Sequence, residues 1–280
     1  MRIDLHSHSN ASDGTDAPEE VVRRARQAGV DVLALTDHDT VDGIGHATDA
    51  LPPGLTLVPG AEISCRLGST SMHLLAYLFD PAHPELSEAL AALRADRLRR
   101  GEAMVRCCAE LGAPLSWDRV REIARGGAVG RPHVARALVE AGVVDTVAAA
   151  FSPDWIGDGG RAYVPKRSLD PVEAVGLVRG AGGVPVLAHA LAESRGAVVG
   201  EEVVEALAAA GLGGLEADHP DHTADARAAL RALAHRLDLF VTGSSDDHGS
   251  LTGHRLGCET TDPTAYARLL DEAARPPVSR

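Results

Sequence analysis

Two histidines, His6 and His8, follow the first apolar segment of the chain at a spacing of two residues. In an extended backbone, residues i and i+2 point to the same side, so both imidazoles can reach a single ion. Taken alone, the pair is equally compatible with two unrelated surface histidines, because histidine serves many purposes in proteins. Its meaning therefore depends on which residues lie at the ends of the other apolar segments.

Histidines and carboxylates follow other apolar segments in the same manner. They are Asp13 in the turn-like SDG, Asp37 and His38 in TDHD, Glu62, His189, and Asp246 with His248. The carboxyl ends of the strands of an α/β barrel share one rim, so these side chains would converge. His73 fits this rule less well, because it precedes its apolar segment, residues 74–78.

Four or more imidazoles with several carboxylates form a ligand set suited to manganese, zinc or iron. The four cysteines lack metal-binding spacing, which argues against a purely structural zinc site. Each residue taken singly is better explained as a hydrogen-bonded core histidine or a helix-capping aspartate. Those explanations do not account for histidines and carboxylates that recur at the end of one predicted strand after another. We therefore expect a catalytic site with more than one metal ion.

The elements that must position these residues alternate between short apolar strands and helices. Strands are expected at residues 3–5, 32–36, 55–58, 74–78, 184–188, 214–217 and 239–242, and a helix at 18–29. This alternation predicts an α/β barrel. Residues 81–165 show helical patterns without strand-like segments. We expect them to form an inserted cap domain between barrel segments 1–80 and 166–280.

Composition and charge narrow the function. The 280 residues are 45% hydrophobic and 24% charged, as in ordinary globular proteins. The net charge of −13 disfavours long duplex nucleic acid as a partner, because a strongly acidic surface repels polyanions. Neither a signal segment nor a membrane-spanning apolar run is present, so we expect a cytoplasmic protein without a membrane partner. The sequence leaves the oligomeric state open.

Together, the motifs DLHSHSNASDG, TDHD, GAE, AHA and SSDDHG resemble the polymerase and histidinol phosphatase (PHP) superfamily. The resemblance spans nearly the whole chain. It implies a metal-dependent phosphoesterase built on a distorted (β/α)7 barrel of the PHP type. It also implies two or three divalent ions, with manganese expected and zinc or iron as alternatives.

The resemblance assigns ligands to each ion by position. One ion would be held by His6, His8, Glu62 and Asp246. Glu62 would bridge to a second ion held by His73 and His189. A third ion would be held by Asp13, His38 and His248.

The resemblance also bears on proton transfer and on the outer groups of the site. Asp246, His248 and His38 are candidates for proton transfer. Asp37 and Asp39 are expected to orient His38 or nearby waters from outside the ligand set. The chain departs from the family in reading AHA for AHP and in having two adjacent aspartates before the last histidine, of which the Asp-x-His spacing favours Asp246.

A narrower similarity connects the segments GRPHVARALVEAG and YVPK to the bacterial 3′,5′-nucleotide bisphosphate phosphatases and 5′-3′ exoribonucleases with a helical cap. It implies that cationic groups near the cap bind substrate phosphate. The candidates are Arg131, His133 and Lys166, followed by Arg195 and His222. His219 receives less weight, and a solvated helix face is expected for Arg94, Arg97 and Arg100.

The reaction expected from these residues is removal of the 3′-phosphate from a nucleoside 3′,5′-bisphosphate by metal-activated water. Bound ions would reverse the local field of the acidic chain, which favours a small phosphorylated nucleotide or a short oligonucleotide as substrate. Three alternatives stay open: a 5′-3′ exonuclease on short RNA or DNA, a histidinol phosphate phosphatase, and a non-catalytic metal-dependent binding module.

Overall fold

The computed structural model describes residues 1–125, 127–193 and 198–280. Seven strands lie side by side in chain order within one sheet, and β8 pairs with β3 off this path. The strands are β1 (Ile3–Asp4), β2 (Val32–Leu35), β3 (Thr56–Leu67), β4 (Thr70–Tyr77), β5 (Val184–Leu187), β6 (Gly214–Asp218), β7 (Phe240–Gly243) and β8 (Val278–Ser279).

The sheet curls until its two edges meet. Ser7, after β1, forms an isolated bridge with Asp247, after β7. The His8 N–H also donates to the Asp247 carbonyl at 2.9 Å, and the Asp246 N–H donates to the His6 carbonyl at 2.9 Å. The result is a nearly closed seven-stranded barrel, so the predicted fold class is confirmed.

The regular alternation of strand and helix fails between β3 and β4. These strands form an antiparallel hairpin that pairs Ser64 with His73 and Glu62 with Leu75. β3 continues to Leu67 instead of ending near residue 58, as the apolar pattern predicted. Because β4 runs in the opposite direction, its first residues lie where the other strands end, which explains why His73 precedes its apolar segment.

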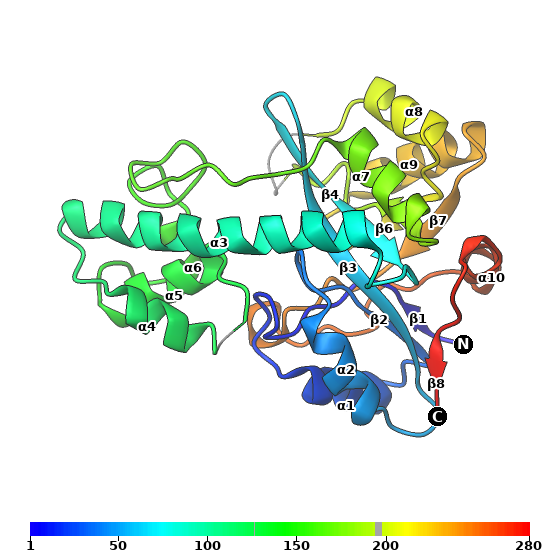
Figure 1. Ribbon diagram of the computed structural model, residues 1–280, viewed down its shortest axis with the longest axis horizontal. Helices are drawn as coiled ribbons and strands as arrows, with labels where there is room; N and C mark the ends of the chain where they lie inside the picture. The colour runs from blue at the N-terminus through cyan, green and yellow to red at the C-terminus, as the bar shows by residue number, and fades with distance from the viewer. Residues whose placement is uncertain (126, 194–197) are drawn as a thin grey trace.

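Helices surround the barrel (Figure 1). They are α1 (Pro18–Gln27), α2 (Asp42–Asp49), α7 (Pro171–Gly180), α8 (Glu201–Ala209), α9 (Ala224–Arg236) and α10 (Pro263–Glu272). Their ends follow local rules: α7 begins at a proline behind Asp170, whose carboxylate accepts hydrogen bonds from the N–H groups of Val172 and Glu173. None of the helices in the described ranges has an apolar stretch able to cross a bilayer.

The helical segment predicted after residue 80 projects from the barrel, at the left of Figure 1. It contains α3 (Pro84–Glu110), α4 (Trp117–Ile123), α5 (Arg131–Glu140) and α6 (Val147–Ala150). Helix α3 belongs to two cores. Leu86 and Leu90 pack with the barrel core, whereas Met104 and Cys108 pack with α4 and α5. The boundaries drawn at residues 81 and 165 stay a prediction, because packing divides within α3.

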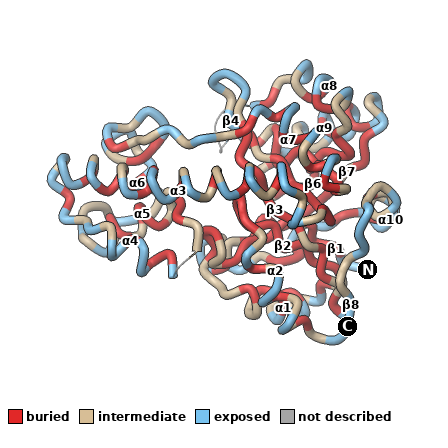
Figure 2. The backbone as a smooth tube through the Cα atoms, viewed as in Figure 1, coloured by how far each residue is buried: buried red, intermediate tan, exposed pale blue. Residues whose placement is uncertain are grey.

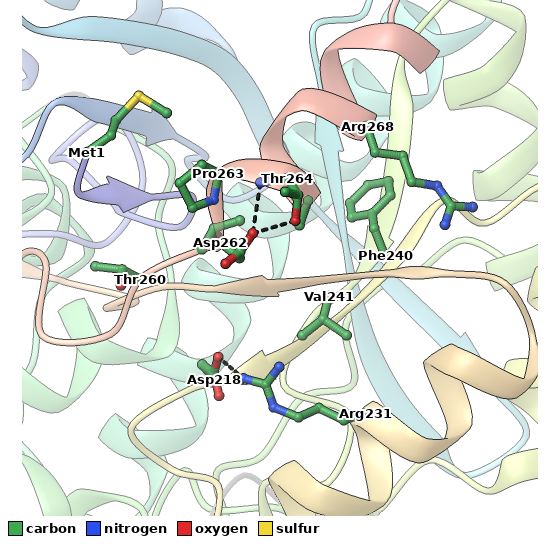
Figure 3. Close-up of a pocket in the computed structure, with 12 residues that line it drawn as sticks. Met1, Asp218, Arg231, Phe240, Val241, Thr260, Asp262, Pro263, Thr264 and Arg268 are labelled. Atoms are coloured by element: carbon green, nitrogen blue, oxygen red, sulfur yellow. Dashed lines mark hydrogen bonds and ion pairs between the residues drawn. The ribbon is translucent and has the colours of Figure 1, made fainter.

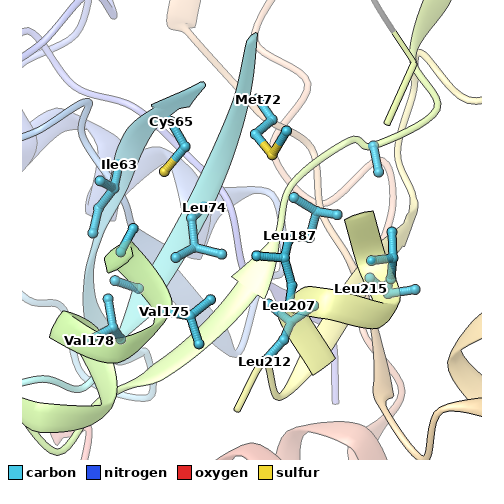
Figure 4. Packing of buried hydrophobic residues seen from close by; sticks show 14 of the residues in the cluster. Ile63, Cys65, Met72, Leu74, Val175, Val178, Leu187, Leu207, Leu212 and Leu215 are labelled. Atoms are coloured by element: carbon cyan, nitrogen blue, oxygen red, sulfur yellow. The ribbon is translucent and has the colours of Figure 1, made fainter. Parts of the chain in front are cut away.

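Buried residues concentrate on the strands and on the sides of the helices that face them (Figure 2). Ile63, Leu74 and Leu187 of the sheet pack against Val175 of α7 and Leu207 of α8 (Figure 4). Burial of this apolar surface stabilises the strands whose ends carry the polar residues.

Candidate metal centre

The rings of His6 and His8 lie together after β1, and both residues are fully buried. Their Nε2 atoms are 3.0 Å apart. Two nitrogens at this separation can bind one ion, because metal–nitrogen bonds of zinc are about 2.0–2.1 Å long. The i, i+2 spacing therefore places the two rings as expected.

Glu62, in the middle of β3, is surrounded by histidine nitrogens. The distances to its nearest carboxylate oxygen are 2.8 Å for His38 Nδ1 and His73 Nδ1, 3.0 Å for His189 Nε2, 3.3 Å for His8 Nε2 and 3.4 Å for His6 Nε2. Three of these nitrogens face one oxygen and two face the other. Burial by itself would raise the pKa of Glu62, but the histidines hold it well below its usual value. The carboxylate thus joins two groups of imidazoles.

Asp246 contributes a second buried carboxylate to the cluster. Its Oδ1 lies 3.2 Å from His8 Nε2, 3.4 Å from His6 Nε2 and 3.5 Å from His248 Nδ1. The neighbouring Asp247 instead accepts hydrogen bonds within its own turn, from the Gly249 N–H among others. Asp246 is therefore the aspartate that reaches the histidines, as the Asp-x-His spacing favoured.

Asp13 lies at the outer side of the cluster. Its Oδ1 is 3.3 Å from His248 Nε2 and its Oδ2 is 3.7 Å from His38 Nε2. Three groups of atoms in the described residues are close enough to hold a metal ion. They are His8, Asp13, His38 and His248; His6, His8 and Asp246; and His38, Glu62 and His73.

Two buried nitrogens support metal binding by this cluster. Within the described residues, Nδ1 of His38 and Nδ1 of His73 have no hydrogen-bond partner, although each lies 2.8 Å from Glu62. Buried polar atoms without a hydrogen-bond partner are rare in proteins, and a bound ion is one common explanation for them. The donors are all nitrogen and oxygen, which suits borderline and hard divalent ions. The cluster is thus well suited to holding metal ions.

The backbone is held in uncommon conformations at this rim. Asp39, His189 and Asp246 have φ angles of 57°, 27° and 47°. This left-handed region is unfavourable for residues other than glycine, and such strain tends to occur at functional sites. Surrounding hydrogen bonds must therefore stabilise these turns.

Asp37 stabilises the loop that carries His8 and Asp13. Its carboxylate accepts hydrogen bonds from the Ser9 N–H at 2.8 Å, the Ser9 hydroxyl at 2.6 Å and the Ser12 hydroxyl at 2.6 Å. These bonds hold the loop in place. The expectation that Asp37 orients His38 or nearby waters stays a prediction.

Asp39 connects the rim to the helical segment. Its carboxylate accepts from the Ser64 N–H at 2.7 Å and from Arg97 Nε at 2.6 Å. Arg97 and Arg100 are 9% and 7% exposed, so the predicted solvated face of α3 is wrong for both. A single sequence could not show that α3 lies over the rim at these positions.

Two buried residues of the site were missed or given little weight. Glu216 accepts from His6 Nδ1 at 3.0 Å and from the His189 N–H at 2.8 Å. His219 Nε2 lies 3.2 Å from Asp246 Oδ2. A charged residue inside the apolar segment 214–217 was the available signal for Glu216.

A cavity of 660 Å³ opens from the metal cluster toward the helical segment. His73 and His189 line it together with Lys166, and so do Arg100 and Arg131 of the helical segment. The Arg131 guanidinium lies over the Phe151 ring and pairs with Asp158 at 2.7 Å. Lys166 Nζ lies 3.0 Å from His73 Nε2. Burial, together with the nearby Arg97 charge, lowers the pKa of Lys166 to about 8.

His133 and His222 are not among the described residues that line this cavity. His133 is buried at the start of α5, where its Nδ1 accepts from the Gly130 N–H at 3.0 Å. His222 uses both ring nitrogens on backbone groups, those of Ala217 and Leu191. The predicted part of both residues in binding substrate stays a prediction. Arg195 lies outside the described residues.

A second large cavity, of 690 Å³, lies beside β7 and α10 (Figure 3). Asp218 and Arg231 form an ion pair on its wall, and Asp262 caps α10. The described residues that line it include no histidine and none of the predicted ligands. We assign no chemistry to it.

Comparison with known proteins agrees with this geometry. The PHP domain model matches residues 4–95. A 5′-3′ exoribonuclease of Haemophilus influenzae is 34% identical over 88% of this chain and 90% of its own length. The chain belongs to the PHP family.

Other PHP proteins are similarly close. A 3′,5′-nucleoside bisphosphate phosphatase of Chromobacterium violaceum is 32% identical over 90% of this chain and 89% of its own length. The solved structure of a metal-dependent phosphoesterase from Bifidobacterium adolescentis has a TM-score of 0.90 and 38% identity, covering 97% of this chain and 96% of that one. This PHP protein is thus a hydrolase, a metal-dependent phosphoesterase.

Proposed function

We propose that this PHP protein removes the 3′-phosphate from nucleoside 3′,5′-bisphosphates. One observation carries the proposal: a single cavity of 660 Å³ is lined by histidines of the cluster and by cations from the helical segment. Its volume lies within the usual range for small-molecule sites, about 300–1,000 Å³. A substrate with two phosphates can place one at each end.

The nine predicted ligands would hold two or three divalent ions, with manganese expected. Such ions lower the pKa of water and neutralise charge on phosphoryl oxygens. In the same proposal, His38 and His248 accept or donate a proton only when the third ion is absent, because a nitrogen bound to an ion has no free lone pair.

The cationic residues have separate roles in this proposal. Lys166 contacts His73, so we assign it to the phosphate that reacts. Arg131 is assigned to the second phosphate, because it lines the cavity next to Phe151 and Asp158. This division replaces the simpler expectation of a three-residue clamp that included His133.

The test compares adenosine 3′,5′-bisphosphate with an aryl phosphate in the presence of Mn²⁺. Arg131→Ala should lower kcat/KM for the bisphosphate by roughly 10 to 200-fold, the range for a lost charge-assisted contact of ~1.4 to 3 kcal/mol, and leave the aryl phosphate nearly unchanged. Lys166→Ala should lower both activities. Arg106→Ala, an exposed change on α3, serves as the control. Equal losses of Arg131→Ala on both substrates would contradict the assignment.

A 5′-3′ exoribonuclease is the second candidate, favoured by the Haemophilus influenzae relative of that name. The two activities differ in their products. Stepwise shortening of a 5′-phosphorylated oligoribonucleotide, with little release of phosphate from the bisphosphate, would favour the exonuclease. Elemental analysis of protein purified with metal present should find at least two equivalents of divalent ion under either proposal, and less than one would contradict both.

A further inference from the structure

Glu216 is a fully buried carboxylate in the middle of β6 that the proposed reaction does not use. Its Oε1 accepts hydrogen bonds from His6 Nδ1 at 3.0 Å and from the Ser244 hydroxyl. Its Oε2 accepts from the backbone N–H of His189 at 2.8 Å. A buried carboxylate is costly unless it is paired, so this position requires a reason beyond packing.

The bond to His6 decides which ring nitrogen can bind a metal. A neutral imidazole has one N–H, and an acceptor at Nδ1 keeps the proton there. The lone pair of Nε2 then points to the other side, where Glu62 and Asp246 oxygens both lie 3.4 Å away.

The bond to His189 acts on the backbone. His189 has a φ of 27°, which is uncommon for a residue other than glycine. The N–H bond to Glu216 stabilises this turn, and the turn directs His189 Nε2 to within 3.0 Å of Glu62.

We propose that Glu216 is a positioning residue that holds His6 and His189, ligands of two different metal ions, in place at the same time. Glu62 contacts the ring Nε2 atoms of both histidines from inside the cluster, and Glu216 holds the same two residues from outside. The inference rests on the proposed metal ligands. It adds that the binding of two ions depends on one carboxylate that lies outside the ligand set.

Glu216→Gln tests this role without a large change in volume. A glutamine has one oxygen and one NH₂ group, so it cannot accept from His6 and from the His189 N–H with separate atoms. Either the NH₂ group meets the His189 N–H, or it faces His6 Nδ1 and moves the ring proton to Nε2. In either arrangement one of the two bonds is lost, and the other is weakened because a neutral amide oxygen is a poorer acceptor than a carboxylate, so both ligands are disturbed.

His219→Gln is the matched control, because within the described residues the only proposed ligand that His219 reaches by a hydrogen bond is Asp246, and it meets His189 only through an edge contact between rings 5.4 Å apart. Its Nε2 lies 3.2 Å from Asp246 Oδ2, and its Nδ1 accepts from the Asp221 N–H at 3.0 Å. It should affect the ion bound by Asp246 and leave the ion near His73 and His189 unchanged.

The experiment titrates metal-free wild type and both variants with Mn²⁺ and measures bound ions by equilibrium dialysis and elemental analysis. Glu216→Gln should weaken two ions by roughly 10 to 100-fold each, the usual effect of losing an outer partner, and His219→Gln should weaken one. Unchanged Mn²⁺ affinities in Glu216→Gln with a lowered Tm would reduce Glu216 to a packing role and overturn the proposal. Less than one Mn²⁺ bound by the wild type would instead overturn the metal centre itself.

A measurement on the wild type keeps the proposal falsifiable if the variant does not fold. Long-range ¹H–¹⁵N spectra of the histidine rings, recorded with and without Zn²⁺, report which nitrogen of His6 carries the proton. The proposal requires the proton on Nδ1 in the Zn²⁺-loaded protein. A proton on Nε2 would overturn it.

Discussion

The carboxylates of Glu62 and Asp13 differ in the number of histidine nitrogens that lie close to them. Glu62 lies within 3.4 Å of five histidine nitrogens, whereas Asp13 lies 3.3 Å from His248 and 3.7 Å from His38. We therefore expect Glu62→Gln to lower kcat/KM more than Asp13→Asn does, by roughly tenfold or more. Both variants are assayed at saturating Mn²⁺. Equal losses would contradict the bridging position of Glu62.

The protonation of His6 and His8 leads to a second prediction at the scale of single residues. Burial would lower the pKa of His8, but Asp246 and Glu62 raise it to about 10, and the pKa of His6 is raised in the same direction. A metal binds the unprotonated ring, so it must displace these protons. Below these pKa values the apparent Mn²⁺ affinity should increase about tenfold per pH unit for each proton displaced.

Isothermal titration calorimetry in two buffers of different ionisation enthalpy measures the protons released. The control is the wild type with its metal already bound. An affinity that stays constant between about pH 6.5 and 8.5 would show that the rings are not protonated before metal binding.

Helix α3 carries two arginines whose ion pairs have the same length but differ in how far they are buried. Arg97 pairs with Asp39 and Arg94 pairs with Asp42, both at 2.6 Å. The Arg97 side chain is 10% exposed, whereas the side chains of Arg94 and Asp42 are 38% and 66% exposed. Arg97→Ala leaves the buried Asp39 carboxylate without its charged partner.

We expect Arg97→Ala to lower the free energy of unfolding by about 3–5 kcal/mol, as when one partner of a buried ion pair is removed. Arg94→Ala should cost about 0–1 kcal/mol, because water already solvates that pair. Urea denaturation measures both. Similar values for the two variants would mean that Arg97 does not anchor α3 to the rim.

Charge matters at the scale of the whole molecule, because the net charge is −13 while the cavity contains Arg100, Arg131 and Lys166. A small nucleotide meets mainly the local cations, and a long oligonucleotide also meets the acidic surface. We expect kcat/KM to be lower for a 5′-phosphorylated RNA of about 20 nucleotides than for a dinucleotide. The difference should narrow as salt screens the surface charge. A preference for the longer RNA at low salt would contradict this prediction.

The sequence alone predicted the barrel and most of the histidines and carboxylates that the structure brings together at its rim. Strand periodicity and the position of His6, His8, His38 and Asp246 just beyond apolar segments were enough, because strand ends share one rim in such a barrel. These are local properties of the chain. The resemblance to PHP motifs additionally indicates which residue in each motif is the expected ligand.

Only the tertiary structure decided the outer groups of the site. Glu216, Arg97 and His133 owe their roles to contacts between segments far apart in the chain, such as the bond between Glu216 and His6. The reversed direction of β4, which brings His73 to the rim, likewise depends on pairing with β3. A linear pattern states which residues are polar or apolar, but burial and partners depend on how the elements pack, and packing is set by the chain as a whole.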